Sequence, residues 1–428
     1  MPPLAAPFRA ALALIALILA LLLLAAPASA ESVPARPAQA FVNSLGINTH
    51  TYYQDTVYYQ RFETIERRLH ELGVRHIREN VVLHRPDQYR MLNRLADHGI
   101  DAQLIAGDPR NGLGGMRALV DLLANRLDDA VAAIEGPNEY DLSGDRRWRP
   151  KLARYQRALY RQVRATPELA GIPVVGPSIG PHHDPVDVPD LTGALDFGNV
   201  HSYPDGDAPE PDLDEWLGAA SRTSGPKRVM ATETGYHTAL RARDGQRPVS
   251  EAAMATYVPR VYLDYFARGI VRTFPYELAD ERPDPRRVEP EENFGLLRHD
   301  LSPKPAFTAV RNLVDLVEDP GPRFTAGSLD FTLGGDTEEL GSLLLQKRDG
   351  RFYLALWRTT SVWDADARAR LSPGASPVRL TFATQPDRVT LFLPNRSGTA
   401  QAELPLSAGA TSLEVGPRVA VLEIDPAG

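Results

Sequence analysis

A regular alternation of short apolar runs and longer amphipathic segments most constrains what this chain can fold into. In the longer segments, such as Phe62–Leu72, apolar residues return every three or four positions, which is typical of a helix packed on a core. The short runs begin near Leu45, Val74, Ala102, Val131, Ile172, Leu195, Arg228 and Ile270. Eight strand–helix units about 30 residues apart predict an α/β fold whose eight parallel strands close into a (β/α)8 TIM barrel.

Glycines mark the expected ends of two helices. Gly73 and Gly99 follow amphipathic segments at positions where a left-handed cap favours a residue without Cβ. The main alternative fold is an open doubly wound sheet, which has the same alternation. Such a sheet is expected to carry a Gly-rich phosphate loop after its first strand, whereas this chain has Asn48–Tyr53 there. The barrel is therefore favoured.

A break at Asp319–Pro322 marks the expected domain boundary. It follows a helical segment, Lys304–Leu316, that would complete the eighth unit. Alternating strands are expected beyond it, at Ser342–Gln346, Phe352–Trp357, Val378–Phe382, Val389–Leu393 and Ala420–Ile424. We assign residues 31–319 to the barrel and residues 320–428 to an antiparallel β-sandwich. The sandwich is expected to brace the barrel or, as an alternative, to bind sugar.

The first 30 residues have the order of a secretory signal peptide. Arg9 precedes an unbroken apolar stretch, Ala10–Ala26, and small residues follow at Pro27–Ala30. We expect cleavage after Ala30 and a secreted or periplasmic protein. The alternative is an uncleaved N-terminal anchor, because the apolar stretch is close to the length that spans a bilayer. No later segment is apolar enough, so no membrane span is expected after cleavage.

Composition excludes several functional classes. The chain has no cysteine, which excludes disulfides, zinc–thiolate sites and cysteine nucleophiles. A net charge of −8 argues against a nucleic-acid partner, which would require a basic surface. His182–Asp184 is not interpreted as a metal site, because no further ligand lies at a fixed offset. We expect a monomer without metal or organic cofactor.

Two glutamates stand where predicted strands end. Strand four runs from Val131 into Asn138 and Glu139, and strand seven runs from Arg228 into Glu233. The C-terminal ends of barrel strands converge on one mouth, so strands three units apart face each other across it. Glycoside hydrolases commonly use two carboxyl groups on opposite sides of the scissile bond. The alternative is a pair of salt-bridged carboxylates with a structural role.

Three motifs carry a family resemblance. They are Gly136–Glu139, His201–Pro204 and Thr232–His237. In this order and spacing the chain resembles the clan A superfamily of retaining glycoside hydrolases on (β/α)8 barrels, closest to its family 39 and family 5 (cellulase-like) branches, over about Val42–Val317. The resemblance implies a carbohydrate substrate, with Glu139 as the general acid/base and Glu233 as the nucleophile. Electrostatics agrees with a division of roles, because two carboxylates about 5 Å apart do not both ionise easily.

The same resemblance implies roles for four supporting residues. Asn138 is expected to bond the sugar 2-hydroxyl, and His201 another substrate hydroxyl. Tyr203 is expected to donate a hydrogen bond to the nucleophile, and Arg78 to lower its pKa.

Structural alternatives remain open for three of these residues. Arg78 could form an ion pair with Glu79 or Glu135. Tyr203 could be a core aromatic residue, and His201 a buried histidine with both nitrogens bonded.

The ends of strands one and eight give weaker candidates. Asn48 and His50 close strand one, and Tyr276 and Glu277 close strand eight. Related enzymes commonly place a Trp at the end of strand eight as a sugar platform, and here Tyr276 or Phe274 is the expected substitute. Glu277 is expected to bind sugar hydroxyls or to pair with an arginine. Tyr236, in the motif that follows strand seven, is a further supporting candidate.

The sequence thus predicts a secreted retaining glycoside hydrolase that acts on an extracellular polysaccharide or glycoside. Two alternatives stay open. One is a carbohydrate-binding protein that keeps a glycosidase barrel without turnover. The other is a transglycosylase, because a sugar hydroxyl can capture the same covalent intermediate in place of water.

Overall fold

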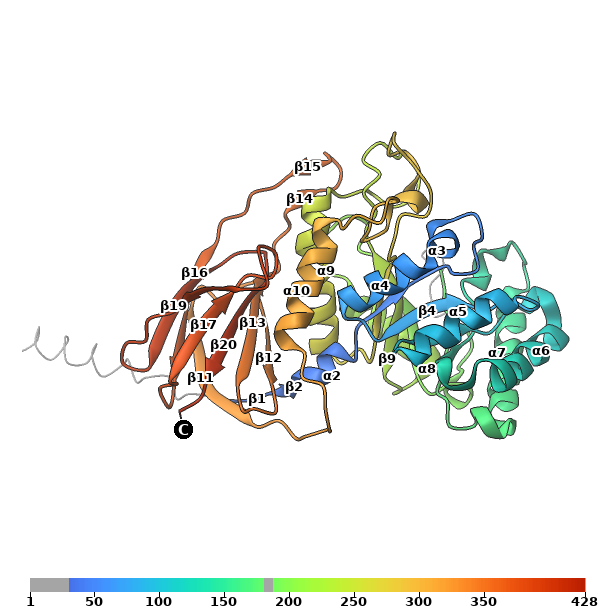
Figure 1. Ribbon diagram of the computed structural model, residues 1–428, viewed down its shortest axis with the longest axis horizontal. Coiled ribbons are helices and arrows are strands. Elements are labelled where there is room, and N and C mark those ends of the chain that lie inside the picture. The colour runs from blue at the N-terminus through green and yellow to red at the C-terminus, as the bar shows by residue number, and fades with distance from the viewer. Residues whose placement is uncertain (1–30, 181–187, 428) are drawn as a thin grey trace, which may run out of the picture.

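The computed structural model describes residues 31–180 and 188–427, which form two parts side by side (Figure 1). One part contains parallel strands with helices, and the other contains mainly antiparallel strands. The predicted signal peptide and the His182–Asp184 segment lie outside the described residues. Within the described residues, no helix combines the length and the apolar character that a membrane crossing requires.

Eight parallel strands form two sheets. In chain order they are β3 (Gly46–Asn48), β4 (His76–Asn80), β5 (Asp101–Ile105), β6 (Val131–Glu135), β7 (Val174–Val175), β8 (Gly198–His201), β9 (Val229–Gly235) and β10 (Thr273–Tyr276). The first sheet has the order β3-β4-β5-β6-β7 and the second β10-β9-β8. Parallel bridges from Val175 to Phe197 and from Leu45 to Thr273 connect the sheets at both edges. The mixed α/β prediction is confirmed, and each strand begins within three residues of its predicted start.

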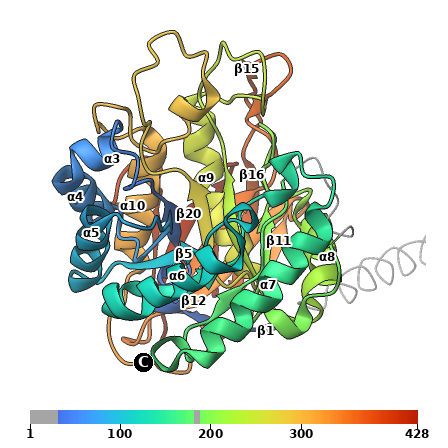
Figure 2. The same ribbon diagram turned by 90° about the vertical axis from the view of Figure 1, so that its right-hand side faces the viewer.

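Helices lie on the outside of these strands, as Figure 2 shows for α4 to α7. The helices are α2 (Ala38–Val42), α3 (Val57–Gln60), α4 (Phe62–Leu72), α5 (Pro86–Asp97), α6 (Gly112–Arg126), α7 (Trp148–Ala165), α8 (Leu213–Ser224), α9 (Glu251–Ala267) and α10 (Pro305–Val317). Gly73 and Gly99 both have positive φ, 79° and 82°, as expected for left-handed caps.

One predicted helix does not form as expected. Between β7 and β8 the described residues contain only a short 3-10 turn, Thr192–Ala194. The prediction that a long helix follows every strand is therefore wrong for the fifth unit. Proline is the physical reason in the described parts of this segment, where Pro177 and Pro189 each remove a helical donor and clash with a preceding turn.

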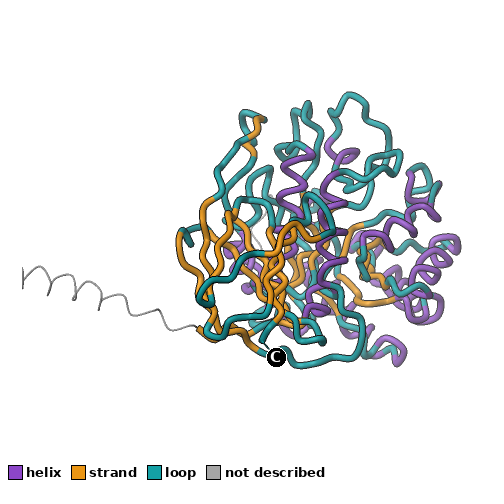
Figure 3. The backbone as a smooth tube through the Cα atoms, turned by 60° about the vertical axis from the view of Figure 1, so that its left-hand side comes forward, coloured by secondary structure: helices purple, strands orange, loops and turns teal. Residues whose placement is uncertain are grey.

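The C-terminal part is built from two sheets that share an apolar core (Figure 3). Its strands are β11 (Ser328–Gly335), β12 (Leu340–Gln346), β13 (Phe352–Arg358), β14 (Trp363–Asp364), β15 (Ala369–Arg370), β16 (Ser376–Phe382), β17 (Arg388–Phe392), β18 (Ala400–Glu403), β19 (Ala410–Val415) and β20 (Ala420–Asp425). One sheet has the order β1-β11-β16-β19 and the other β18-β17-β20-β13-β12-β2. All five strands predicted in this region form.

The N-terminal residues correct the predicted domain boundary. Strand β1 (Glu31–Pro34) pairs antiparallel with β11, and β2 (Arg36–Pro37) pairs parallel with β12. The assignment of residues 31–37 to the barrel is therefore wrong, because their backbone hydrogen bonds complete the C-terminal sheets. The two parts are joined at both ends of the parallel-strand region.

A buried ion pair fastens α9 to the C-terminal part. The Arg260 guanidinium is fully buried and binds both oxygens of Glu210 at 2.7 and 2.5 Å. It also donates to the carbonyl oxygens of Thr359 and Thr360, in the segment that leaves β13. A hairpin of β14 and β15 then reaches toward the parallel strands, where the Trp363 indole donates to the Pro248 carbonyl at 2.9 Å.

We predict that Arg260→Met lowers the free energy of unfolding by about 3–5 kcal/mol, because it leaves the Glu210 charge buried without its partner. Denaturant unfolding followed by circular dichroism measures this change. Arg388→Met is the matched control, because Arg388 pairs with Asp425 on the surface and its loss is worth at most about 1 kcal/mol. Equal losses in the two variants would contradict the structural role of Arg260.

Candidate active site

The structure brings Glu139 and Glu233 together at the C-terminal ends of parallel strands. Glu139 follows β6 after a Gly-Pro-Asn turn, and Glu233 lies within β9. One carboxylate oxygen from each lies within 4.8 Å of the other and of a His201 ring nitrogen. The Glu139 side chain is 21% exposed and the Glu233 side chain 12%, whereas His201 is completely buried. Both carboxylates are thus within reach of a ligand at the mouth.

The Arg78 guanidinium is the positive centre of this site. It donates to both oxygens of Glu135 at 2.8 and 2.7 Å and to Glu233 Oε1 at 2.6 Å. The amide oxygens of Asn138 and Asn48 accept its remaining bonds, at 2.6 and 3.0 Å. Arg78 is 3% exposed. Arg78 therefore contacts Glu233, the predicted nucleophile. It also forms the ion pair with Glu135 that was the alternative prediction for this residue.

Two donors hold Glu233 in its ionised form. The Tyr203 hydroxyl donates to Oε2 at 2.7 Å, and Arg78 binds Oε1. Burial by itself opposes ionisation of Glu233, but the charges of His201 and Arg78 and the bonds from Tyr203 and Arg78 outweigh it and lower the pKa of Glu233 well below its usual value. A carboxylate that stays charged at neutral pH can act as a nucleophile.

His201 contacts Glu139, and this differs from the expected contact with a substrate hydroxyl. Its Nδ1 lies 2.7 Å from Glu139 Oε1, and its Nε2 lies 3.0 Å from Thr232 Oγ1. The Thr232 hydroxyl donates its single proton to Asn199 Oδ1, whose amide orientation is fixed by donation to the Gly176 carbonyl. Since Thr232 has no second proton, His201 Nε2 must donate to it. Nδ1 therefore faces Glu139 as the site that can accept or give a proton.

The pKa of His201 is raised although the residue is buried. Burial lowers the pKa of His201, but the charge of Glu233 and the hydrogen bond and charge of Glu139 exceed this effect. The imidazolium proton on Nδ1 is therefore retained above the pH at which an ordinary histidine loses it, and it lies between Nδ1 and Glu139 Oε1, which are 2.7 Å apart. From there it can pass to Glu139, as general acid catalysis requires.

Asn138 is oriented for a ligand. Its Oδ1 accepts from Arg78 and from the Ser178 hydroxyl, at 2.6 and 3.1 Å. The amide Nδ2 has no partner within the described residues and remains able to donate to a ligand oxygen. Ser178 also accepts a bond from the Glu139 backbone N–H at 3.1 Å. Ser178 was not among the predicted site residues, although it lies just beyond β7, the fifth parallel strand, where polar residues are expected to face the mouth.

An open cavity lies beside Asn138. Its volume is about 500 Å³, and the ends of β4 and β5 contribute most of its lining. Tyr52, Asp108 and Arg110 place polar groups around it. The cavity provides room for a sugar next to the catalytic pair.

The strand-one and strand-eight candidates form a separate buried group. Glu277 is fully buried, accepts a bond from the Tyr58 hydroxyl at 2.8 Å, and lies 3.6 Å from His50 Nε2. Burial lowers the pKa of His50 to about 4, and burial together with the charge of Glu281 raises the pKa of Glu277 well above its usual value. The expected pairing of Glu277 with an arginine is therefore wrong, because Tyr58 and His50 occupy that place.

Two further candidates have mainly supporting contacts. Asn48 is buried, its Nδ2 donates to the Phe274 carbonyl at 3.0 Å, and its Oδ1 receives Arg78. The Tyr276 hydroxyl donates to Glu291 at 3.2 Å, and its ring contacts His50 edge to face.

Tyr236 is a core residue. It is 1% exposed, its hydroxyl donates to the Asp207 carbonyl at 3.0 Å, and its ring packs against Tyr257. Its predicted role at the site is wrong, because the chain turns into the packed interior directly after β9, where Asp207 and Tyr257 occupy its hydroxyl and ring.

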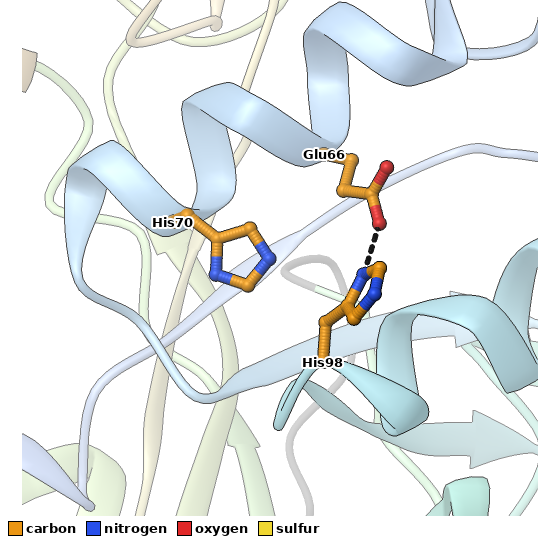
Figure 4. Close-up of side chains that lie close together, drawn as sticks. All are labelled: Glu66, His70 and His98. Carbon is orange, nitrogen blue, oxygen red and sulfur yellow. Dashed lines mark hydrogen bonds and ion pairs between the residues drawn. The ribbon is translucent and has the colours of Figure 1, made fainter.

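Three groups of side chains within the described residues have metal-ligating composition. Two are the Glu139–His201–Glu233 and His50–Glu277–Glu281 groups at the mouth. The third is Glu66, His70 and His98 on the outer helices, where Glu66 and His98 approach to 2.6 Å (Figure 4). Arg94 occupies the other Glu66 oxygen, so a cation at this group would have to displace an existing ion pair.

Comparison with solved structures identifies the fold. A family 39 glycoside hydrolase from the gut symbiont Bacteroides cellulosilyticus WH2 aligns with 92% of this chain and 83% of its own, at 17% identity and a TM-score of 0.64. A glucosidase from Croceicoccus marinus aligns with 85% of this chain and 92% of its own, at 13% identity and a TM-score of 0.57. This chain has the fold of these glycoside hydrolases.

A family 30 endoxylanase from Clostridium papyrosolvens C71 shares the same glycoside-hydrolase fold. It aligns with 92% of this chain and 98% of its own, at 9% identity and a TM-score of 0.53. No protein-family model matches the sequence. No curated protein matches it either. The high coverage shows that the likeness to these three structures extends over both the parallel-strand part and the C-terminal sheets.

We predict that Tyr203→Phe moves the acid limb of the pH profile of kcat/KM to higher pH by about one unit, because a hydrogen bond to a charged group is worth about 1.5–3 kcal/mol. The depressed pKa of Glu233 keeps this carboxylate ionised below pH 4.5 in the wild type, and losing a donor raises that pKa. Tyr236→Phe is the matched control and should leave the limb in place. An acid limb that stays at the wild-type pH in Tyr203→Phe would show that this hydroxyl does not lower the pKa of Glu233.

We predict that His201→Gln moves the basic limb to lower pH, because the glutamine amide cannot hold the mobile proton that the raised pKa of His201 retains. The loss of rate should be greatest for substrates with poor leaving groups, which need that proton. Thermal unfolding of the variant separates this effect from a loss of folded protein. A basic limb that stays at the wild-type pH would overturn the proton-sharing role.

Proposed function

We propose that this protein is a secreted retaining glycoside hydrolase, with Glu233 as nucleophile and Glu139 as general acid/base. The observation that carries the proposal is the approach of the two carboxylates to within 4.8 Å, oxygen to oxygen. Retaining enzymes hold these groups about 5–5.5 Å apart, whereas inverting enzymes separate them by about 6.5–9.5 Å to admit a water. The glycoside-hydrolase fold and the strand-end positions of both residues support the same assignment.

The proposed architecture is a closed (β/α)8 barrel with a C-terminal β-sandwich. Two observations support closure: the five-stranded and three-stranded sheets are both parallel, and bridges connect them at each edge. A closed barrel places the ends of β6 and β9 on one mouth. The composition of residues 1–30 supports secretion, since it has the features of a signal peptide.

In the first step, Glu233 attacks the anomeric carbon while Glu139 gives its proton to the glycosidic oxygen. The bond to the leaving group breaks, and a glycosyl ester forms on Glu233. Arg78 and Tyr203 hold the attacking carboxylate ionised before this step. The free Nδ2 of Asn138 is placed to bond a sugar hydroxyl, a contact that strengthens as positive charge develops at the anomeric carbon.

In the second step, the ester removes the negative charge of Glu233. His201 then loses the nearby anion that raised its pKa, so the pKa of His201 falls. Glu139 accepts a proton from water, the water oxygen attacks the anomeric carbon, and Glu233 is released as a carboxylate. Two successive displacements give retention of configuration. A binding protein without turnover would have no need for a carboxylate kept ionised at the mouth.

We predict that Glu139→Gln lowers kcat/KM by about 10²–10⁴-fold on glycosides with poor leaving groups, because general acid catalysis contributes that much. The loss should be far smaller with a dinitrophenolate leaving group, which departs without protonation. Hydrolysis of a panel of aryl glycosides measures both. Glu215→Gln, an exposed carboxylate on α8, is the control and should retain wild-type rates.

We predict that Glu233→Ala loses hydrolysis and that added azide restores cleavage to a glycosyl azide of inverted configuration, since azide fills the space of the missing carboxylate. Proton NMR identifies the anomer formed by the variant and by the wild type. A wild-type product that is first released with inverted configuration would exclude Glu233 as the nucleophile.

A further inference from the structure

A cavity of about 470 Å³ lies between the start of α9 and the loops of the C-terminal sheets. Ser250 lines it at the helix start, Arg370 at the end of the β14–β15 hairpin, Arg396 after β17, and Arg418 before β20. None of the residues that contact Glu139 or Glu233 lines it. The cavity is therefore a second site, built jointly by both parts of the molecule.

Three arginines give this cavity a positive charge. Arg370, Arg396 and Arg418 form no salt bridge and no side-chain hydrogen bond with the described residues, and Glu414 is the one acidic residue among the lining groups. In the same part of the chain, Arg388 is paired with Asp425. The three exposed guanidinium groups outnumber the single carboxylate of the lining, so the cavity has a net positive charge although the chain as a whole has a net charge of −8.

The start of α9 adds to this positive field. The helix has 17 residues, and Ser250 caps it by accepting from the Ala253 N–H at 3.2 Å. The first turn of a helix carries a partial positive charge that favours anions. Ser250 and Ala253 both line the cavity. The dipole and the three guanidinium groups therefore act in the same direction.

Apolar side chains form another part of the cavity wall. Val362, Leu371 and Leu393 line it, and Asn395 is held beside them because its Nδ2 donates to the Ala255 carbonyl at 2.6 Å. A ligand that matches the cavity therefore carries an anionic group and also has apolar atoms that can contact these side chains.

We propose that this cavity binds a carboxylate-bearing sugar, a uronate unit of an oligosaccharide, with its carboxylate held by Arg370, Arg396 and Arg418. Arginine is suited to this ligand because its planar fork binds carboxylates through two parallel hydrogen bonds. The choice of a saccharide rests on the proposed function, whereas the anion site rests on the cavity alone. The volume lies in the range of pockets that enclose small ligands, about 300–1,000 Å³.

The position of the cavity relates the proposed binding of a uronate to the catalytic mouth. The chain leaves the C-terminal end of β9, which carries Glu233, and reaches the start of α9 through the loop that precedes Ser250. The cavity thus lies toward the mouth end of the strands, and Arg370 of the β14–β15 hairpin lines it. Figure 1 shows this hairpin beside one end of α9. A distal uronate bound there would anchor an acidic polymer while another part of it occupies the catalytic mouth.

Titration calorimetry of the intact protein with trigalacturonate tests the proposal. We expect binding by the wild type that weakens as salt is added, roughly tenfold or more weaker binding by the Arg396→Ala/Arg418→Ala variant, and unchanged binding by Arg379→Ala, an exposed arginine on β16 outside the cavity. The methyl ester of trigalacturonate, which lacks the charges, should not bind.

Three results would overturn the proposal: no binding of trigalacturonate by the wild type, equal binding by the double variant, or equal affinity for inorganic sulfate, which would indicate a simple anion site. Hydrolysis of an uncharged aryl glycoside should be unchanged in the double variant, because the cavity does not include the catalytic pair. Calorimetry requires no turnover, so loss of the uronate site and failure of the proposed hydrolase function give separate results.

Discussion

The buried guanidinium of Arg78 is the interaction on which the mouth of this molecule depends. It is a positive charge placed among two carboxylates, Glu135 and Glu233, with two asparagine oxygens completing its hydrogen bonds. A buried charge is tolerated only when it is paired and its donors are satisfied. Arg78 meets both conditions by joining β3, β4, β6 and β9, so its ion pairs also fix where these strand ends lie.

The different roles proposed for Glu233 and Glu139 follow from the positive charge of Arg78. Glu233 has Arg78 on one oxygen and Tyr203 on the other, and it stays ionised. Glu139 has no guanidinium partner within the described residues. It contacts His201, whose other nitrogen must donate to Thr232. The two glutamates thus have different surroundings, because Glu233 contacts a fixed cation and Glu139 contacts a histidine whose pKa is raised.

The C-terminal part is coupled to the mouth more closely than a simple brace would be. Arg247, in the loop after β9, pairs with Asp205 and Asp207 in the loop after β8, and with Asp366 at the tip of the β14–β15 hairpin. Asp205 lies two residues beyond Tyr203. The segment that carries the tyrosine of the site is therefore held by ion pairs that reach into the C-terminal sheets.

Local patterns in the sequence determined the alternation of strands and helices, the left-handed caps at Gly73 and Gly99, and the candidate roles of Glu139 and Glu233. These features depend on neighbours a few residues apart, or on the rule that parallel strands end on one side. The pairing of residues 31–37 with the C-terminal strands was not predicted, because strand pairing depends on residues about 300 positions away.

Only the tertiary structure decided which partner each polar residue of the mouth has. His201 and Tyr203 follow the same strand, yet one binds Glu139 and the other Glu233. Tyr236 belongs to the same motif as Glu233 but lies in the core. Sequence determines which residues reach the strand ends, since that depends on local periodicity. Their partners, and so their protonation states, depend on side chains that converge from separate strands, and no local pattern contains that information.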